Sequence, residues 1–263
     1  MKTQANGIAF NCRIDGPEDA PWLMLSNSLA TNLSMWDQQV AVLAETYHVL
    51  RYDQRGHGAS DALAGDYDFK LLADDAAALM QAHGIAACHF VGLSMGGMTA
   101  MDLGLNHPER LLSVTIANSC ADATQAFRDV FDGRIALALA EGMAPLVETT
   151  VGRWFTEELR ASEPDFLEDV REMVRTTPPV GYAGCARAVQ NIDYMSRLSA
   201  VDKPVLLIAG AQDIATPPDG MRAMQDVISG AQYVELEPAS HLSNLEQPQA
   251  FTAAVQEFLA AQG

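Results

Sequence analysis

The chain has 263 residues and a formal charge of -18, with 34 acidic residues against 16 basic ones. Hydrophobic residues make up 49% of it and charged residues 19%, a composition that supports a full core and excludes intrinsic disorder. The excess of acid argues against nucleic acids and anionic membrane surfaces as partners, because few cations are available to neutralise phosphate groups. An anionic ligand would need a local pocket of positive charge.

Seven short segments are predicted to be strands, mostly apolar runs bounded by turn residues. They are Ile8–Ile14, Trp22–Ser26, His48–Tyr52, His89–Gly92, Val114–Ala117, Val205–Gly210 and Tyr233–Leu236. Apolar residues spaced three and four apart predict helices between them. These are Met35–Glu45, Phe69–His83, Gly97–Asn106, Pro218–Ser229 and Pro248–Ala261. The alternation of strand and helix favours an α/β fold with one mostly parallel sheet and helices on both faces.

Residues 120–196 interrupt this alternation, because they contain no convincing strand. Four helices are predicted there: Phe127–Glu141, Met143–Phe155, Pro164–Thr176 and Tyr182–Ser196. Amphipathic helices over about 75 residues would bury their apolar faces most easily against the sheet. We therefore interpret residues 120–196 as a helical cap on a core formed by residues 1–119 and 197–263.

Neither a metal site nor a membrane segment is indicated. The four cysteines lie far apart and form no CxxC pair, and the histidines are scattered, so we expect no metal and no cofactor. No uncharged apolar run approaches the ~18–20 residues of a membrane span, and Met1–Phe10 lacks an apolar signal core. Free thiols of this kind are typical of a reducing compartment, so we expect a cytoplasmic protein. The sequence does not indicate an oligomeric state.

The string Gly92-Leu93-Ser94-Met95-Gly96 matches the G-x-S-x-G pattern of a nucleophilic serine. An apolar strand leads into it and a helix leads out, as the chemistry requires. On such a turn the serine adopts a strained backbone conformation and is presented above the sheet, and glycines on either side leave room for the turn. We predict that Ser94 is the nucleophile; the alternative is a tight glycine turn without a catalytic role.

A serine hydroxyl needs a base, and six histidines compete for that role. Only His241, after the last predicted strand, comes late enough for the chain order Ser…Asp…His that serine hydrolases of this kind use. His57, in a loop after the third predicted strand, is a candidate for lining the pocket. Asp213 follows Val205–Gly210 at the carboxyl end of that strand, where ligand chemistry occurs in open α/β sheets. We predict Asp213 as the acid that orients His241.

Two backbone N–H groups are predicted to stabilise the oxyanion that forms when an ester carbonyl is attacked. One belongs to Met95, directly after the nucleophile. The other is expected in the loop after the second predicted strand, Ser26-Asn27-Ser28-Leu29, with the N–H of Leu29 as the donor.

Longer strings follow the pattern of one family along nearly the whole chain. They are Ser26-Asn27-Ser28-Leu29, Met35-Trp36-Asp37, Arg51-Tyr52-Asp53, Arg55-Gly56-His57-Gly58, Gly92-Leu93-Ser94-Met95-Gly96-Gly97, Arg153-Trp154-Phe155-Thr156, Gly181-Tyr182-Ala183 and His241-Leu242-Ser243-Asn244. In these strings the chain resembles the 3-oxoadipate enol-lactonases, α/β-hydrolases of the β-ketoadipate route of aromatic degradation. The triad strings are shared by all α/β-hydrolases, whereas the Ser-Asn-Ser-Leu loop and the cap strings are more specific.

The resemblance implies the α/β-hydrolase fold, with a helical cap inserted after the sixth strand, and a serine hydrolase that opens a small cyclic enol ester bearing a carboxylate. The cap contains seven arginines, no lysine and thirteen acids, so individual arginines would have to face inward. Arg134 matches the family pattern and is expected to bind the substrate carboxylate. Ser28 and Trp154 are expected to line the substrate site, although a tryptophan between apolar helices is equally often core packing.

Three residues depart from the family pattern. Gln54, Ala30 and Phe131 stand where the family usually has Thr, Gly and Trp. Two other functions remain open. One is a broad-specificity carboxylesterase or perhydrolase with the same triad. The other is a non-catalytic small-molecule receptor built on a hydrolase scaffold. A carboxylated enol lactone compared with neutral esters separates these possibilities.

Overall fold

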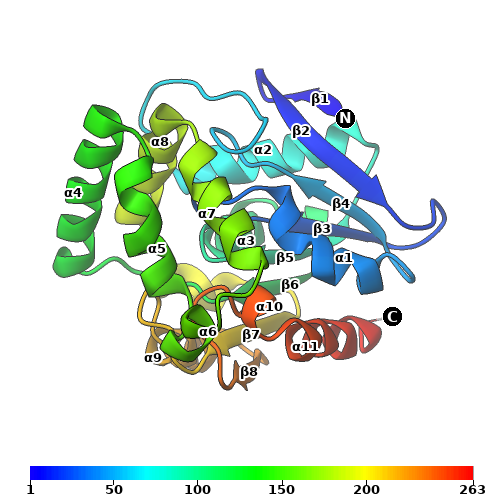
Figure 1. Ribbon diagram of the computed structural model, residues 1–263. Coiled ribbons are helices and arrows are strands. Elements are labelled where there is room, and N and C mark those ends of the chain that lie inside the picture. Colours follow the sequence, from blue (N-terminus) through cyan, green and yellow to red (C-terminus); the bar gives the residue numbers. More distant parts are fainter. Residues whose placement is uncertain (263) are drawn as a thin grey trace.

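The computed structural model describes residues 1–262, which form an eight-stranded sheet flanked by helices (Figure 1). The strand order is β1-β2-β4-β3-β5-β6-β7-β8. The strands are β1 Lys2–Ala5, β2 Ile8–Asp15, β3 Trp22–Ser26, β4 His48–Tyr52, β5 Cys88–Leu93, β6 Leu111–Ala117, β7 Val205–Gly210 and β8 Gln232–Leu236. Strands β4, β3, β5, β6, β7 and β8 pair in parallel, whereas β1 and β2 are antiparallel to their neighbours. The predicted α/β class is confirmed.

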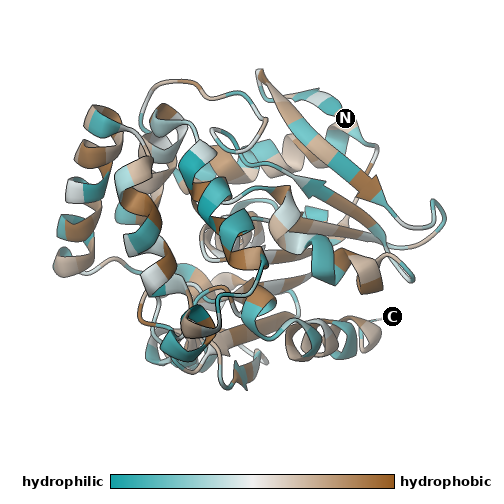
Figure 2. Cartoon of the chain, viewed as in Figure 1, coloured by the Kyte–Doolittle hydropathy of each residue, from teal (hydrophilic) through white to brown (hydrophobic). Residues whose placement is uncertain are grey.

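The seven predicted strands correspond to β2 through β8, and β1 was missed. Every residue of β5 and β7 is buried, which explains why both read as continuous apolar runs. β2 instead alternates buried and half-exposed positions along most of its length, and Figure 2 shows the matching alternation of hydrophobic and hydrophilic residues. β1 consists of Lys2, Thr3, Gln4 and Ala5 and is exposed or half-exposed throughout, so no hydrophobic signal marks it.

Helices cover both faces of the sheet. The helices of this part are α1 Asp37–Leu43, α2 Phe69–Ala82, α3 Met95–Asn106, α9 Pro218–Val227, α10 Ser243–Glu246 and α11 Pro248–Ala260. Helix α1 packs against α11 on one face, and α2 packs against α3 on the other (Figure 1). Short 3-10 helices occupy Leu33–Trp36, Pro108–Arg110, Ala144–Leu146 and Met195–Ala200. Met35–Glu45, predicted as one helix, is therefore divided between a 3-10 turn and α1.

Between β6 and β7 the chain forms five helices, where four were predicted. They are α4 Gln125–Glu141, α5 Val147–Trp154, α6 Glu157–Ser162, α7 Phe166–Thr176 and α8 Pro179–Gln190. Helix α4 packs against α8 and α5 against α7, so the helices bury their apolar sides on one another (Figure 1). The short polar α6 was missed. Helix α8 begins three residues earlier than predicted, because Pro179 suits the first turn of a helix.

Two further findings bear on expectations from the sequence. Among residues 1–262, none of the helices combines the length and hydrophobicity that a membrane span requires. The four cysteines are free thiols; Cys12, Cys88 and Cys185 are buried and Cys120 is half-buried.

Candidate active site

Ser94 lies on the turn between β5 and α3, with φ 55° and ψ -113°. A residue with a side chain rarely adopts such angles, and they mark a strained turn. Two close backbone approaches hold the turn. A Cβ atom on Gly92 would lie 2.1 Å from the carbonyl oxygen of Gly96, and one on Gly96 would lie 2.1 Å from the carbonyl oxygen of Ser26. Both glycines are therefore required by the geometry.

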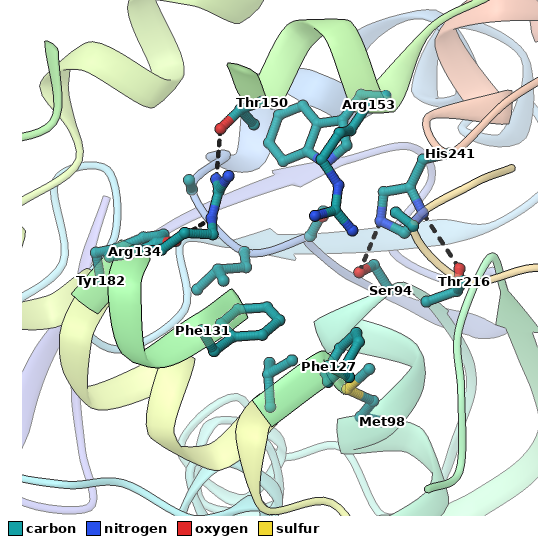
Figure 3. A pocket seen from close by; sticks show the side chains of 16 residues that line it. Ser94, Met98, Phe127, Phe131, Arg134, Thr150, Arg153, Tyr182, Thr216 and His241 are labelled. Carbon is teal, nitrogen blue, oxygen red and sulfur yellow. Dashed lines mark hydrogen bonds between the residues drawn. The ribbon is translucent and has the colours of Figure 1, made fainter. Parts of the chain in front are cut away.

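Ser94, His241 and Asp213 form one chain of hydrogen bonds. Nε2 of His241 lies 2.9 Å from Oγ of Ser94, and Nδ1 of His241 lies 2.8 Å from Oδ2 of Asp213 (Figure 3 draws the first of these bonds). The exposed fractions of Ser94, His241 and Asp213 are 8%, 3% and 3%, so these three side chains are almost inaccessible to bulk water. Residues separated by more than a hundred positions are thus brought into one arrangement.

Asp213 is held as a carboxylate by donors on several sides. Its Oδ1 accepts bonds from the backbone N–H groups of Ala215 at 2.8 Å and Thr216 at 3.0 Å. Its Oδ2 accepts from Oγ1 of Thr216 at 2.8 Å and from Nδ2 of Asn118 at 3.0 Å. Burial alone would raise the pKa of Asp213, but the charge and hydrogen bond of His241 and these further donors lower it below its ordinary value.

Asn118 and Thr216 were missed by the sequence reasoning. Asn118 directly follows β6, and its Nδ2 also donates to the carbonyl oxygen of Ser240, 3.1 Å away, so it ties the end of β6 to the loop of His241. Asn118 could have been identified from the sequence as a site residue, because it follows a buried parallel strand and ligand-binding residues lie at the carboxyl ends of such strands.

The loop after β3 presents a free N–H group to the site. The N–H of Ser28 donates to Sδ of Met35 at 3.4 Å, and that of Ala30 donates to Nε2 of His57 at 2.9 Å. The N–H groups of Leu29 and Met95 have no hydrogen-bond partner within residues 1–262. Both expected oxyanion donors are therefore available for a ligand.

Two buried side chains fix this loop from behind. Nε2 of Gln54 donates to the carbonyl oxygen of Asn27 at 2.6 Å. Burial lowers the pKa of His57 to about 4, so the ring is neutral near pH 7; Nδ1 donates to the carbonyl oxygen of Arg55 and Nε2 accepts from Ala30. The hypothesis that His57 lines the pocket is wrong, because the ring lies behind the loop. Ala30 has φ 61°, which explains why a glycine is also suited to this position.

The neutral state of His57 makes protein stability depend on pH. Its pKa is about 4 in the folded protein against 6.5 for a free histidine. Between these values the unfolded chain binds a proton that the folded chain does not, so the free energy of unfolding falls as the pH falls. The full difference corresponds to about 3 kcal/mol. Denaturant unfolding at pH 7 and pH 4.5 should show a larger loss for the wild type than for His57→Gln. Equal losses in both proteins would contradict this assignment.

A cavity opens above Ser94. It is lined by Ser28, Leu29, Ala30, Ser94, Met98, Phe127, Phe131, Arg134, Thr150, Arg153, Trp154, Tyr182, Val189, Ala215, Thr216 and His241. Figure 3 shows the apolar side chains of Met98, Phe127 and Phe131 on one side and both arginines on the other. Loops that follow strands of the sheet, helix α3 and the helices between β6 and β7 thus contribute to the same cavity.

The two arginines differ in their surroundings. Arg134 donates from Nε to the hydroxyl of Tyr182 at 3.0 Å and from Nη2 to Oγ1 of Thr150 at 2.5 Å. Arg153 has no hydrogen-bond or ion-pair partner within residues 1–262, and burial together with the charge of Arg134 lowers its pKa. Neither arginine is paired with a carboxylate from that part of the chain. The cavity therefore contains two guanidinium groups without an ion-pair partner from residues 1–262, in a protein of net charge -18.

Ser28 and Trp154 also border the cavity. Oγ of Ser28 is buried and has no hydrogen-bond partner within residues 1–262. The Trp154 ring stacks on His241 with centroids 6.3 Å apart and planes inclined by 27°. Trp154 thus packs against the His241 ring and also lines the cavity. In the described residues there is no cluster of three or more His, Cys, Asp or Glu side chains suited to a metal ion.

Comparisons with known proteins agree with this arrangement. A family model described as the α/β hydrolase fold matches residues 21–248. The chain is 38% identical to 3-oxoadipate enol-lactonase 2 of Acinetobacter baylyi, covering 96% of this chain and 93% of that protein. It is 30% identical to a putative carbamate hydrolase of Pseudomonas syringae, covering 93% and 95%.

Solved structures give the same result. The enol-lactonase from Burkholderia xenovorans LB400 superposes with a TM-score of 0.96 and 40% identity, covering 99% of this chain and 100% of that one. A thermophilic esterase from Thermogutta terrifontis reaches a TM-score of 0.93 at 26% identity, covering 100% and 98%. The chain belongs to the α/β-hydrolase fold family, and it is a hydrolase of carboxylic esters with a small-molecule substrate, related to the 3-oxoadipate enol-lactonases.

Proposed function

We propose that this protein is a 3-oxoadipate enol-lactonase, which opens the carboxylated enol lactone to 3-oxoadipate in aromatic catabolism by the β-ketoadipate pathway. One observation carries the proposal. Ser94 and His241, which are hydrogen-bonded to each other and through His241 to Asp213, line the same cavity as two arginines that have no carboxylate partner in residues 1–262. A small anionic ester compensates that charge. Relatives named enol-lactonases, at 38% and 40% identity, support the same substrate.

In this proposal Ser94, His241 and Asp213 are the catalytic triad. Nε2 of His241 accepts the proton of Ser94 Oγ as this oxygen attacks the lactone carbonyl. The ionised Asp213 keeps the proton of His241 on Nδ1 and stabilises the imidazolium that forms. The low pKa of Asp213 suits this role, because the carboxylate stays charged throughout the cycle.

The N–H groups of Leu29 and Met95 form the proposed oxyanion hole, since both are free to bind the oxygen of the tetrahedral intermediate. Collapse of that intermediate breaks the ring C–O bond and expels an enolate oxygen, which becomes a ketone on protonation. Water activated by His241 then releases the acyl group from Ser94. The sequence of steps requires neither a metal nor a cofactor.

Substrate binding is assigned to Arg134, Trp154 and Ser28. Arg134 has neutral partners, so a substrate carboxylate would be its ionic partner. Ser28 supplies an unpaired hydroxyl, and Trp154 forms a wall beside His241. We further propose that residues 120–196 act as a cap on the core of residues 1–119 and 197–263, and that the enzyme works in the cytoplasm.

A substrate panel tests the proposed function. The expected kcat/KM for the carboxylated enol lactone exceeds that for a neutral aryl ester of similar size by roughly 100-fold, because charge-assisted bonds to a half-buried guanidinium are lost in the neutral compound. Steady-state kinetics on purified protein measure both values. A flat panel would instead favour a broad-specificity carboxylesterase or perhydrolase, and binding without turnover would favour a receptor.

A further inference from the structure

Arg153 is exceptional among the arginines between β6 and β7. Arg171, Arg175 and Arg187 form ion pairs with carboxylates, and Arg134 donates to two hydroxyl groups. Arg153 makes no such contact within residues 1–262, although it lines the cavity with Ser94 and His241. A partly desolvated cation without an ion-pair partner is costly, so the presence of half-buried Arg153 in the cavity points to a negative group of the ligand.

The position of Arg153 is coupled to the loop of His241. Its neighbour Trp154, the last residue of α5, stacks on the His241 ring. The carbonyl oxygen of Trp154 accepts a hydrogen bond from the N–H of Leu242 at 3.1 Å. The end of α5 is therefore bound directly to His241 and to the residue that follows it.

A buried carboxylate strengthens this connection. One oxygen of Glu246 accepts bonds from the backbone N–H of Thr156, at 3.1 Å, and from its hydroxyl. The other oxygen accepts from the N–H of Ser240 at 2.8 Å. Glu246 thus joins the chain just after α5 to the residue before His241, and the backbone of Arg153 is held at a defined place relative to the reacting groups.

Arg134 is placed differently. It extends from α4 and is held by Tyr182 of α8 and Thr150 of α5. In Figure 3 the guanidinium of Arg153 points toward Ser94 and His241, whereas that of Arg134 lies beside Tyr182 and Thr150. One cation lies at the reacting end of the cavity and the other lies away from it.

We propose that Arg153 stabilises the oxygen that leaves when the lactone ring opens, while Arg134 binds the substrate carboxylate. The inference rests on the proposed function only in requiring an ester whose leaving group is an enolate. When the tetrahedral intermediate collapses, the ring C–O bond breaks and its electron pair stays on the leaving oxygen. The proton that His241 took from Ser94 then passes to the enolate, which becomes the ketone.

This assignment matches the charges that develop during ring opening. The free substrate carries one negative charge, whereas the acyl-enzyme with its enolate carries two, on neighbouring parts of a short chain. Two guanidinium groups then face two anions. Burial and, after it, the charge of Arg134 lower the pKa of Arg153, so the two cations disfavour each other until the second negative charge forms. The pair therefore favours the ring-opened state over the ground state.

Three variants and two substrates test the proposal. The variants are Arg153→Met, Arg134→Met and, as a matched control in the same segment, Arg175→Met, which removes an exposed and ion-paired arginine. The substrates are the carboxylated enol lactone and the neutral enol lactone with a methyl group in place of the carboxymethyl arm. We expect Arg153→Met to lower kcat/KM for the neutral lactone roughly 10- to 100-fold. Arg175→Met should change it by no more than about threefold, whereas Arg134→Met should lower kcat/KM mainly for the carboxylated lactone.

The dependence of kcat/KM on the leaving group is a measurement that a packing defect in Arg153→Met would not change. For a series of neutral aryl esters, log kcat/KM is plotted against the pKa of the leaving phenol. Arg153→Met should make the slope steeper, because the variant no longer stabilises the charge on the departing oxygen, and Arg153→Lys should restore part of the wild-type slope. The proposal would be overturned if Arg153→Met had the wild-type slope and hydrolysed the neutral lactone at the wild-type rate. It would also be overturned if Arg153→Met lost the same factor in kcat/KM on every substrate and unfolded at a lower temperature.

Failure of the proposed function would be seen separately. If the wild type hydrolyses the neutral enol lactone as well as the carboxylated one, the enol-lactonase assignment fails. The role of Arg153 is still decided by the neutral lactone and the aryl series, which contain no carboxylate.

Discussion

Ser94→Ala is expected to lower kcat by about four to six orders of magnitude while the protein stays folded. Oγ of Ser94 is the atom that His241 holds at 2.9 Å, and without it no acyl-enzyme can form. Alanine keeps a Cβ at the same strained turn, so the backbone energy at φ 55° and the packing of α3 should change little. Single-turnover kinetics and thermal unfolding of the purified variant measure the two effects.

The two other members of the proposed triad provide the controls. His241→Ala should cost about as much as Ser94→Ala, and the double variant should lose no more than either alone, because the two residues act as one unit. Asp213→Asn should cost as much or less. A folded Ser94→Ala protein with turnover near that of the wild type would disprove the assignment of the nucleophile.

The fold could be predicted wherever burial of an element requires a recognisable pattern of apolar residues. Strands β5 and β7 are buried along their whole length and read as apolar runs between turn residues. Strand β1 lies at the sheet edge and is paired on one side to β2, so its residues need no hydrophobic pattern. Helix α8 ends at Gln190, whereas the predicted helix continued to Ser196. The residues after Gln190 keep an apolar spacing typical of a helix, but the chain forms a 3-10 turn over Met195–Ala200.

The site could be predicted where a residue type and its order in the chain are specific. Ser94, Asp213 and His241 follow from a motif, a strand end and the order of the three. The supports of the loop after β3 could not be found in this way. Gln54, which departs from the family pattern, reaches the carbonyl oxygen of Asn27 only because of a tertiary contact between two loops. His57 sits in a recognisable string, but whether it faces a cavity or lies behind one depends on that same packing.

The arginines illustrate the same limit in terms of charge. A sequence shows how many arginines the helices between β6 and β7 carry, but not which of them form ion pairs with carboxylates. Arg187 pairs with Asp132 at 2.7 Å, whereas Arg134 and Arg153 face the cavity. The difference depends on helix rotation and on which neighbours α4 and α8 bring together. Arg134 was expected from the family resemblance, but the place of Arg153 in the same cavity emerges only from the three-dimensional arrangement.

Gly96→Ala is expected to lower kcat by roughly 100- to 1000-fold with a smaller effect on KM. The added Cβ would lie 2.1 Å from the carbonyl oxygen of Ser26 and 3.1 Å from that of Asn27, both backbone atoms. Ser26 pairs with Gly92 across β3 and β5, so these atoms cannot retreat freely. The first turn of α3 and the loop after β3 must move apart instead, and this motion separates the two proposed oxyanion donors that they carry.

Gly104→Ala, in the same helix, is the matched control. A Cβ there would meet the side chain of Val201 at 3.4 Å, an ordinary contact, and alanine stabilises a helix interior relative to glycine by about 1 kcal/mol. This variant should unfold at the same or a higher temperature with unchanged kinetics. Because Gly96→Ala leaves Ser94, His241 and Asp213 chemically intact, its loss should appear also as weaker binding of a tetrahedral phosphonate or boronate inhibitor. Wild-type kcat in Gly96→Ala would mean that catalysis does not depend on the close approach of α3 to β3.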